Sequence, residues 1–167
     1  SPAVLSDDDG PFVRWVRALL QPRARRLGWA VTGGDVARRH AFPRATLWAL
    51  GFLGDDPDTL TRAARIADAW LVDHTAVDPD HAAVALPLAS RRANDARLEA
   101  LRAAIAAART PQERQLALSS LGSFDDPRLL RRALDLSLDD SLRVADLRAL
   151  FAVPGHTPAL REAAAAW

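Results

Sequence analysis

Apolar residues recur along this chain with the spacing of amphipathic helices. In three stretches they are separated by three or four residues, as on a helix with one buried face. Strand-like alternation of β-branched residues is nearly absent. The pattern therefore predicts an all-α fold. The three apolar stripes are Leu60, Ala63, Ala64, Ala67 and Leu71; Leu98, Leu101, Ile105 and Ala108; and Leu130, Ala133, Leu134 and Leu138.

Helix starts are marked by a side-chain oxygen directly before a proline. That oxygen can accept a hydrogen bond from a free N–H of the first turn, and proline at the first helical position has no N–H to leave unpaired. Thr110 is followed by Glu113 at the spacing of a capping box. The predicted starts are Asp56-Pro57, Asp78-Pro79, Thr110-Pro111, Asp126-Pro127 and Thr157-Pro158.

Glycine and proline also predict where helices end or bend. Helices are expected to end near Gly28, Gly54 and Gly122, because glycine can adopt the left-handed conformation that often caps a helix. Pro87 lies inside the apolar segment 82–90 and is expected to kink or split the helix there.

Two segments share a repeated pattern. Residues 47–57 and 118–127 both place Leu-Gly before Asp-Asp-Pro, with one residue dropped in the second. Leucines 60, 98, 130 and 160 would then lie on the second helices of successive hairpins, a spacing of roughly 30–47 residues. We therefore expect residues 1–167 to form one α-solenoid domain of HEAT/armadillo-like helical hairpins, about four after an N-terminal helix. An irregular helical bundle is the alternative.

The composition excludes several classes of protein. The chain has no Cys, so it forms no disulfide, thiolate nucleophile or Cys-based metal site. Its 22 basic residues, all Arg, and 21 acidic residues give a net charge of +1, which argues against a nucleic-acid partner. No apolar run approaches the ~20 residues of a membrane span, so no membrane partner is expected. Without a signal peptide, the expected location is cytoplasmic. Because the sequence begins at Ser1, we expect a fragment of a larger chain.

Few residues suggest catalysis. The segment 73–81 contains His74, His81 and three aspartates, but no His-x-x-x-His pair that would place two imidazoles on one helix face. It is interpreted as an acidic turn, and His40 and His156 as isolated histidines. Ser119 and Ser120 have no histidine nearby, and Gly33-Gly34 is not a phosphate loop. No catalytic or metal-binding residue is assigned.

The arginine clusters are the remaining candidates for binding. On the concave face of a solenoid they could hold phosphates or a peptide carboxylate. The simpler interpretation is a solvated helix face balanced by aspartate, as with Arg62 and Arg65 beside Asp58 and Asp68. No substrate-binding residue is therefore assigned. The clusters are Arg23, Arg25 and Arg26; Arg38-Arg39; Arg91-Arg92; and Arg131-Arg132.

A set of short motifs occurs in a familiar order between residues 110 and 151. They are Glu113-Arg114, Leu121-Gly122, Asp126-Pro127, Leu129-Leu130 and, approximately, Arg143-Val-Ala-Asp146. Upstream, Leu27-Gly28-Trp29 and Leu53-Gly54-Asp55-Asp56 followed by Ala63-Arg65 fit the same order. Together these motifs resemble the C-terminal helical domain of the zinc aminopeptidases, the family of aminopeptidase N and of the puromycin-sensitive and endoplasmic-reticulum aminopeptidases.

The resemblance implies that this chain itself neither binds zinc nor catalyses a reaction. The family's zinc is held by His-Glu-x-x-His and a distal Glu, and its amine-recognition motif contains Met; this chain has no Met, and none of its histidines begins such a motif. Zinc and catalysis would then belong to the catalytic domain of the same polypeptide, a bacterial-type aminopeptidase. This chain would form a lid and scaffold that limits access to the catalytic chamber and contacts peptide substrate. The alternatives are a free-standing HEAT-like adaptor that binds proteins and, less favoured, a DNA-binding helical-repeat protein.

Overall fold

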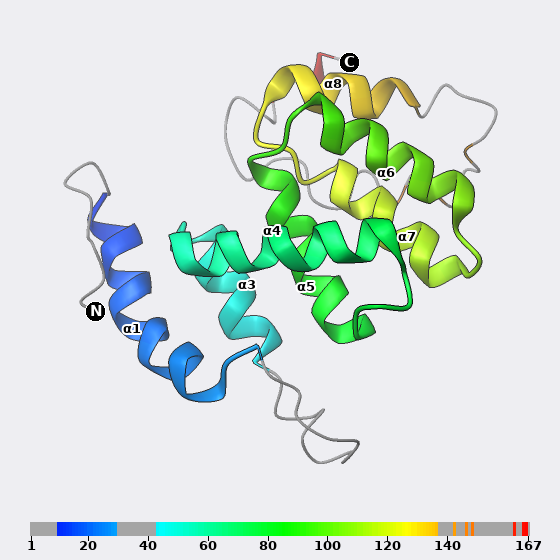
Figure 1. The fold of residues 1–167 in the computed structure, drawn as a ribbon. Coiled ribbons are helices and arrows are strands. Elements are labelled where there is room, and N and C mark those ends of the chain that lie inside the picture. The colour runs from blue at the N-terminus through cyan, green and yellow to red at the C-terminus, as the bar shows by residue number, and fades with distance from the viewer. Residues whose placement is uncertain are drawn as a thin grey trace.

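The computed structural model describes residues 10–29 and 43–136, together with single positions at 142, 146, 148, 162, 165 and 166. Within these residues it contains seven helices and no strand, which confirms the all-α prediction (Figure 1). The helices are α1 (Pro11–Leu27), α3 (Arg44–Phe52), α4 (Pro57–Val72), α5 (Pro79–Arg91), α6 (Asp95–Ala107), α7 (Pro111–Leu121) and α8 (Pro127–Asp135).

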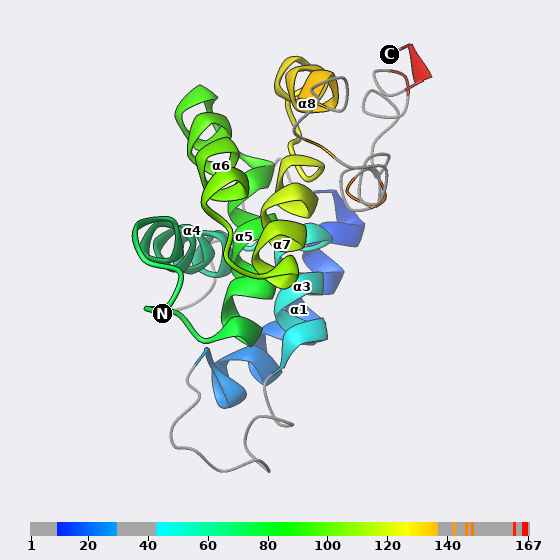
Figure 2. The ribbon, with the colours of Figure 1, turned by 90° about the vertical axis from the view of Figure 1, so that its right-hand side faces the viewer.

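The helices lie in two rows. In one row α3 packs against α5 and α5 against α7, and in the other α4 contacts α6 and α6 contacts α8. Contacts of α4 with α5 and of α6 with α7 join the rows, and Figure 2 shows α4 and α6 on one side of α5 and α7. α1 packs against α3 and lies at one end of the array (Figure 1).

Two groups of buried apolar side chains hold the helices together. The larger draws on α4 to α8 and includes Trp70 and Phe124, the latter from the α7–α8 connection. The smaller lies among α3, α4 and α5 and includes Trp29, which follows α1. The predicted stripes supply much of this core, whereas Leu138 lies outside the described residues. Their buried members are Ala63, Ala67, Leu98, Leu101, Ile105, Leu130, Ala133 and Leu134.

Four of the five predicted helix starts are confirmed. Each capping oxygen accepts a first-turn N–H: Asp56 from Thr59 (3.0 Å), Asp78 from Asp80 (2.9 Å), Thr110 from Glu113 (3.2 Å) and Asp126 from Arg128 (2.8 Å). The fifth start, Thr157-Pro158, lies outside the described residues. Sequence analysis missed the cap of α6, where Asn94 accepts the N–H of Arg97 (3.1 Å), because no proline follows it.

The glycine predictions hold in part. Helices end at or just before all three glycines, as predicted: α1 at Leu27, α3 at Phe52 and α7 at Leu121. Gly28 has a positive φ of 64°, which favours glycine. Gly122 has a φ of −69°, because the helical path continues into a turn in which the N–H of Ser123 bonds the carbonyl of Ser120 (3.1 Å). After α3 the left-handed residue is Asp55, with a φ of 45°, and not Gly54. The left-handed prediction was therefore wrong for Gly54 and Gly122.

Gly54 has a different role, which is to allow a close approach. A Cβ atom at Gly54 would lie 2.9 Å from the carbonyl oxygen of Leu50 and 3.2 Å from Cγ1 of Val16 on α1. The missing side chain thus lets α1 reach the α3–α4 turn.

Pro87 does not split its helix. α5 runs from Pro79 to Arg91 as one helix with Pro87 inside it. Proline there removes one backbone hydrogen bond, but its neighbours Ala85, Leu86 and Leu88 are all buried. Packing on several sides accounts for the continuity of the helix across this position.

The two segments with the repeated pattern occupy matching places in the fold. Leu50 and Leu121 are both buried at the ends of α3 and α7, and Asp56 and Asp126 cap the helices that follow. Arg91, at the end of α5, reaches Asp55 in one turn (3.4 Å) and Asp125 in the other (2.9 Å). The α3–α4, α5–α6 and α7–α8 turns (residues 53–56, 92–94 and 122–126) therefore lie together; we call them the turn edge.

Candidate functional site

A groove of about 800 Å³ opens along α4 and the α4–α5 connection. Trp29, from the end of α1, closes one side of it. A smaller hollow of about 190 Å³ adjoins it and shares Trp29, Asp58 and Arg62. The groove is lined by Trp29, Asp58, Thr61, Arg62, Arg65, Ile66, Ala69, Ala76, Val77, Asp78 and His81.

The side of the groove near Trp29 is held by polar contacts as well as packing. Nε2 of His81 hydrogen-bonds the carbonyl oxygen of Trp29, and the two rings stack with centroids 6.2 Å apart. Nδ1 of His81 lies 3.7 Å from the carboxylate of Asp78, which also caps α5. These contacts fix Trp29 and the start of α5 relative to one another, so this wall is preformed.

Arg62 and Arg65 supply the positive charge of the groove. Three residues apart on α4, they lie on the same exposed side. Neither side chain has an ion pair or hydrogen bond in the described part of the chain. The interpretation that Asp68 balances them is wrong, because Asp68 pairs with Arg97 on α6 (2.7 Å). Two guanidinium groups without an ion-pair partner in the described part of the chain therefore face a groove that is also lined by the carboxylates of Asp58 and Asp78 and by apolar side chains.

This combination suits a ligand that is apolar along its length and anionic at one point. Guanidinium groups bind carboxylates through two parallel hydrogen bonds. The apolar side chains of Ile66, Ala69 and Val77 can pack against a ligand's side chains without selecting a particular ligand sequence. A peptide with a free carboxylate fits this description.

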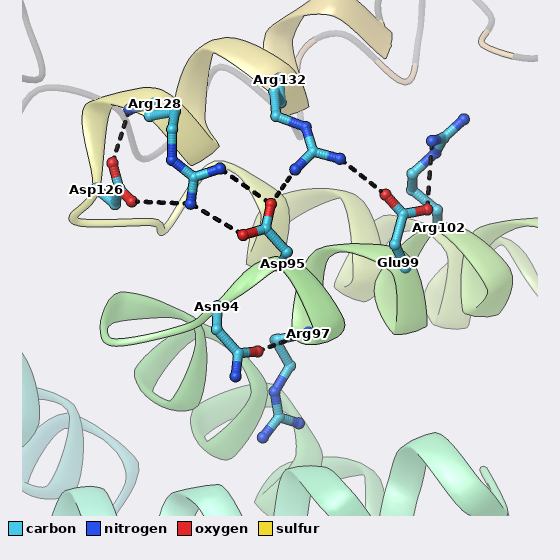
Figure 3. Close-up of polar contacts among 8 residues, drawn as sticks. All are labelled: Asn94, Asp95, Arg97, Glu99, Arg102, Asp126, Arg128 and Arg132. Atoms are coloured by element: carbon cyan, nitrogen blue, oxygen red, sulfur yellow. Dashed lines mark hydrogen bonds and ion pairs between the residues drawn. The ribbon is translucent and has the colours of Figure 1, made fainter.

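Other arginines are occupied by ion pairs between helices. Figure 3 shows Arg128 on α8 bonding both carboxylate oxygens of Asp95 on α6 at 3.0 Å. Arg132 also bonds Asp95 and reaches Glu99 at 3.0 Å. The bond from Arg128 lowers the pKa of Asp95, and Asp95 raises the pKa of Arg128. The network is a structural contact between α6 and α8.

We predict that acid weakens this contact. The pKa of Asp95 is lower in the folded chain, so its pairing adds stability above about pH 4 and loses it as the pH falls through the folded-state value. Asp95→Asn should therefore make the free energy of unfolding, measured with urea, fall less between pH 5 and pH 3. The control is Asp58→Asn, because Asp58 has no ion pair in the described part of the chain. The same pH dependence in both variants would contradict this account.

The remaining arginine clusters differ from one another. Arg91 is largely buried and joins the α3–α4 and α7–α8 turns of the turn edge through Asp55 and Asp125. Arg92 pairs with Asp55. Arg131 is exposed. The α1 cluster is exposed too, whereas Arg38 and Arg39 lie outside the described residues.

The candidate metal ligands of segment 73–81 are dispersed among different partners. His74 stacks on Trp70 with ring centroids 3.9 Å apart, and its Nδ1 lies 3.3 Å from Oε2 of Glu113. Asp73 accepts the N–H of Thr75 (2.8 Å), and Asp80 pairs with Arg44. No group of three or more His, Cys, Asp or Glu able to hold a metal ion occurs among the residues that the structure describes.

The two serines considered as nucleophiles bond their own helix. Ser119 and Ser120 both donate to the carbonyl of Leu116, at 3.0 and 2.7 Å. His40 and His156 lie outside the described residues. No described helix is long and apolar enough to cross a membrane.

Comparison with known proteins gives the family. A model described as the ERAP1-like C-terminal domain matches residues 3–167. The chain belongs to this family. The resemblance noted from its sequence motifs is thereby confirmed. No curated protein and no solved structure matches the chain.

In this ERAP1-like C-terminal domain the motif residues are structural. Arg114 bonds Asp146 (2.9 Å) and the carbonyl of Ile105 (3.2 Å), which ties two of the motifs together across the fold. Leu129 and Leu130 are fully buried, and Asp126 caps α8. None of these side chains lines the groove. Two residues of the resembling segments do line the groove, Trp29 of Leu-Gly-Trp and Arg65 of Ala63-Arg65, whereas Arg62 belongs to no motif. The signal in the sequence that joins Arg62 to Arg65 is their spacing on a helix face.

Proposed function

We propose that this chain is the C-terminal helical domain of a zinc-dependent aminopeptidase, where it acts as scaffold and lid. The observation that carries the proposal is the family match over residues 3–167. Zinc would belong to a catalytic domain elsewhere in the polypeptide, since the described residues offer no group of ligands for it. The domain would limit access to the catalytic chamber and contact peptide substrate.

We also propose that the helices stack as a short α-solenoid. The two rows α3–α5–α7 and α4–α6–α8 support this arrangement, as does the occurrence of equivalent Asp-Asp-Pro turns at the same edge. In such an array each hairpin buries its apolar faces against its neighbours. Stacked hairpins form an extended surface. Such a surface is suited to form one wall of a chamber.

The groove with Arg62 and Arg65 is the proposed site of peptide contact. Its volume of about 800 Å³ is sufficient for several residues of an extended peptide. The two unpaired guanidinium groups would hold the carboxylate at the far end of a peptide whose amino end is being cleaved.

The test uses the full polypeptide with both groove arginines replaced, Arg62→Ala and Arg65→Ala. A hydrogen bond to a charged group contributes about 1.5–3 kcal/mol, so we expect KM for peptides with a free carboxylate to rise about tenfold or more. Hydrolysis of an amino-acid anilide, which has no free carboxylate for the arginines to bind, should not change. Amidation of the peptide's C-terminus should remove most of the difference between variant and parent.

Arg131→Ala is the matched control, because it removes an exposed arginine from α8. It should leave KM for both substrates unchanged. An equal KM for peptide in the double variant and the parent would refute the groove contact. Absence of any aminopeptidase activity in the native polypeptide would refute the larger proposal and favour the adaptor alternative.

A further inference from the structure

The outward face of α1 is apolar although α1 lies at an end of the helix array. Phe12, Trp15 and Leu19 are 57–60% exposed. Their spacing of three and four residues places them on one side of the helix, and the rings of Phe12 and Trp15 lie 6.2 Å apart. Val16 and Arg17, from the same turns, are buried against the rest of the domain. α1 thus carries large apolar side chains on its outward side in addition to the residues that it buries against the domain.

A terminal helix of a stacked array is normally polar on its outer side, because nothing further covers it. α1 departs from that rule at three large side chains, so this face is not built as a solvated cap. An exposed apolar patch of this kind commonly marks an interaction surface.

The charge of α1 indicates the chemistry of what covers it. The helix contains five arginines and no acidic residue. Arg17 is used inside the domain, where it donates to the carbonyls of Gly54 (2.5 Å) and Asp55 (2.8 Å). Arg23, Arg25 and Arg26 are exposed and make no ion pair with their side chains in the described part of the chain. A complementary surface would be an apolar hollow bordered by carboxylates.

The size of the patch favours a partner that is covalently attached. Large aromatic side chains each offer roughly 150–250 Å², so three residues a little over half exposed present about 300 Å². A stable contact between separate molecules buries about 800 Å² on each side. A tethered partner needs less, because the tether gives it a high effective concentration, and interfaces between domains of one chain are typically small and partly polar.

We propose that the outward face of α1, formed by Phe12, Trp15 and Leu19 with Arg23 and Arg26, docks against the part of the same polypeptide that precedes this domain. The contact would be apolar at its centre and would pair these arginines with carboxylates of that part. This rests on the proposed function, which supplies the preceding part, and it assigns the surface through which this domain is held to it.

The test measures thiol accessibility in the full polypeptide. Leu19→Cys places a thiol within the patch, and Val72→Cys is the matched control because Val72 is 89% exposed on α4. Labelling with a maleimide is followed at each site by peptide mass spectrometry. We expect Leu19→Cys to react at least about tenfold more slowly than Val72→Cys, because labelling then requires a local opening of the contact. Adding Trp15→Glu should bring the two rates together.

Each alternative occupant of the patch gives a different result, and each would overturn the proposal. Equal labelling rates would show that the face is open. Protection that appears only as the polypeptide dimerises on concentration would point to a second copy, and protection only with vesicles of anionic phospholipid would point to a membrane surface. Aminopeptidase activity, measured on the same sample, separates the two proposals: an active enzyme with an open α1 face refutes the docking alone.

Discussion

Arg91→Ala is expected to lower the free energy of unfolding by about 3 kcal/mol, as when one partner of a largely buried ion pair is removed. The side chain of Arg91 is only 12% exposed and reaches carboxylates from both sides, at Asp55 and Asp125. It also donates to the carbonyl of Gly51, and its guanidinium lies 5.2 Å from the centre of the Phe52 ring. Its loss would leave these partners without a cation at the turn edge.

The measurement is urea unfolding at pH 7, with two variants for comparison. Arg91→Lys keeps the charge but cannot reach both carboxylates with a planar fork, so we expect a smaller loss. Arg92→Ala removes an arginine that is 63% exposed and pairs with the same Asp55, and it should cost less than about 1 kcal/mol. A loss as small for Arg91→Ala as for Arg92→Ala would show that Arg91 does not link the turns.

Phe124→Ala is expected to be at least as damaging, with a loss of about 3–5 kcal/mol. Phe124 is fully buried in the larger apolar cluster, although it belongs to the α7–α8 connection and not to a helix. Removing the ring would leave a cavity where α7, α8 and their neighbours meet. The neighbouring backbone is held by the bond between the Asp125 N–H and the Arg91 carbonyl (3.0 Å), so little collapse is expected.

The same unfolding measurement tests this prediction. Phe124→Leu keeps most of the apolar volume and should lose clearly less than Phe124→Ala. Val72→Ala shortens an apolar side chain that is 89% exposed and should change the stability by less than about 0.5 kcal/mol. If Phe124→Ala were as mild as Val72→Ala, the cluster would not depend on the side chain of this connection.

The helix starts could be predicted from the sequence because each is a local interaction. The capping oxygen and the N–H that it binds are two or three residues apart, as with Asp56 and Thr59 or Asp126 and Arg128. The apolar stripes were predictable for the same reason, since the period of the helix alone decides which positions share a face. The cap of α6 departs from this pattern, since Asn94 is followed by Asp95 and not by proline.

The pairing of charges could not be predicted in this way. Asp68 lies close to Arg65 in the sequence, yet it binds Arg97, because the contact between α4 and α6 decides which groups meet. Arg91 pairs with Asp55, 36 positions before it, and with Asp125, 34 positions after it. The sequence Arg91-Arg92 does not indicate that the first side chain is largely buried and the second exposed. These distant pairings decide which arginines are left without a partner, as Arg62 and Arg65 are in the groove.

The glycines illustrate how a local rule can fail for a physical reason. A left-handed conformation was expected at Gly54, and it occurs instead one residue later, at Asp55. The absence of a side chain at Gly54 is required by the approach of Val16 from α1, a contact between residues 38 positions apart. Sequence alone indicates that glycine is needed near a turn, but not whether the backbone or a neighbouring helix requires it.

The bridging position of Arg91 also bears on where this domain can accept insertions. The turns on either side of it must keep their length, since an added residue would carry Asp55 or Asp125 beyond the reach of one guanidinium. The α4–α5 connection has no such crosslink to Arg91, and it borders the groove through Ala76 and Val77. Relatives that differ in length are therefore expected to vary at this connection, so the groove could be reshaped among them while the helix array stays the same.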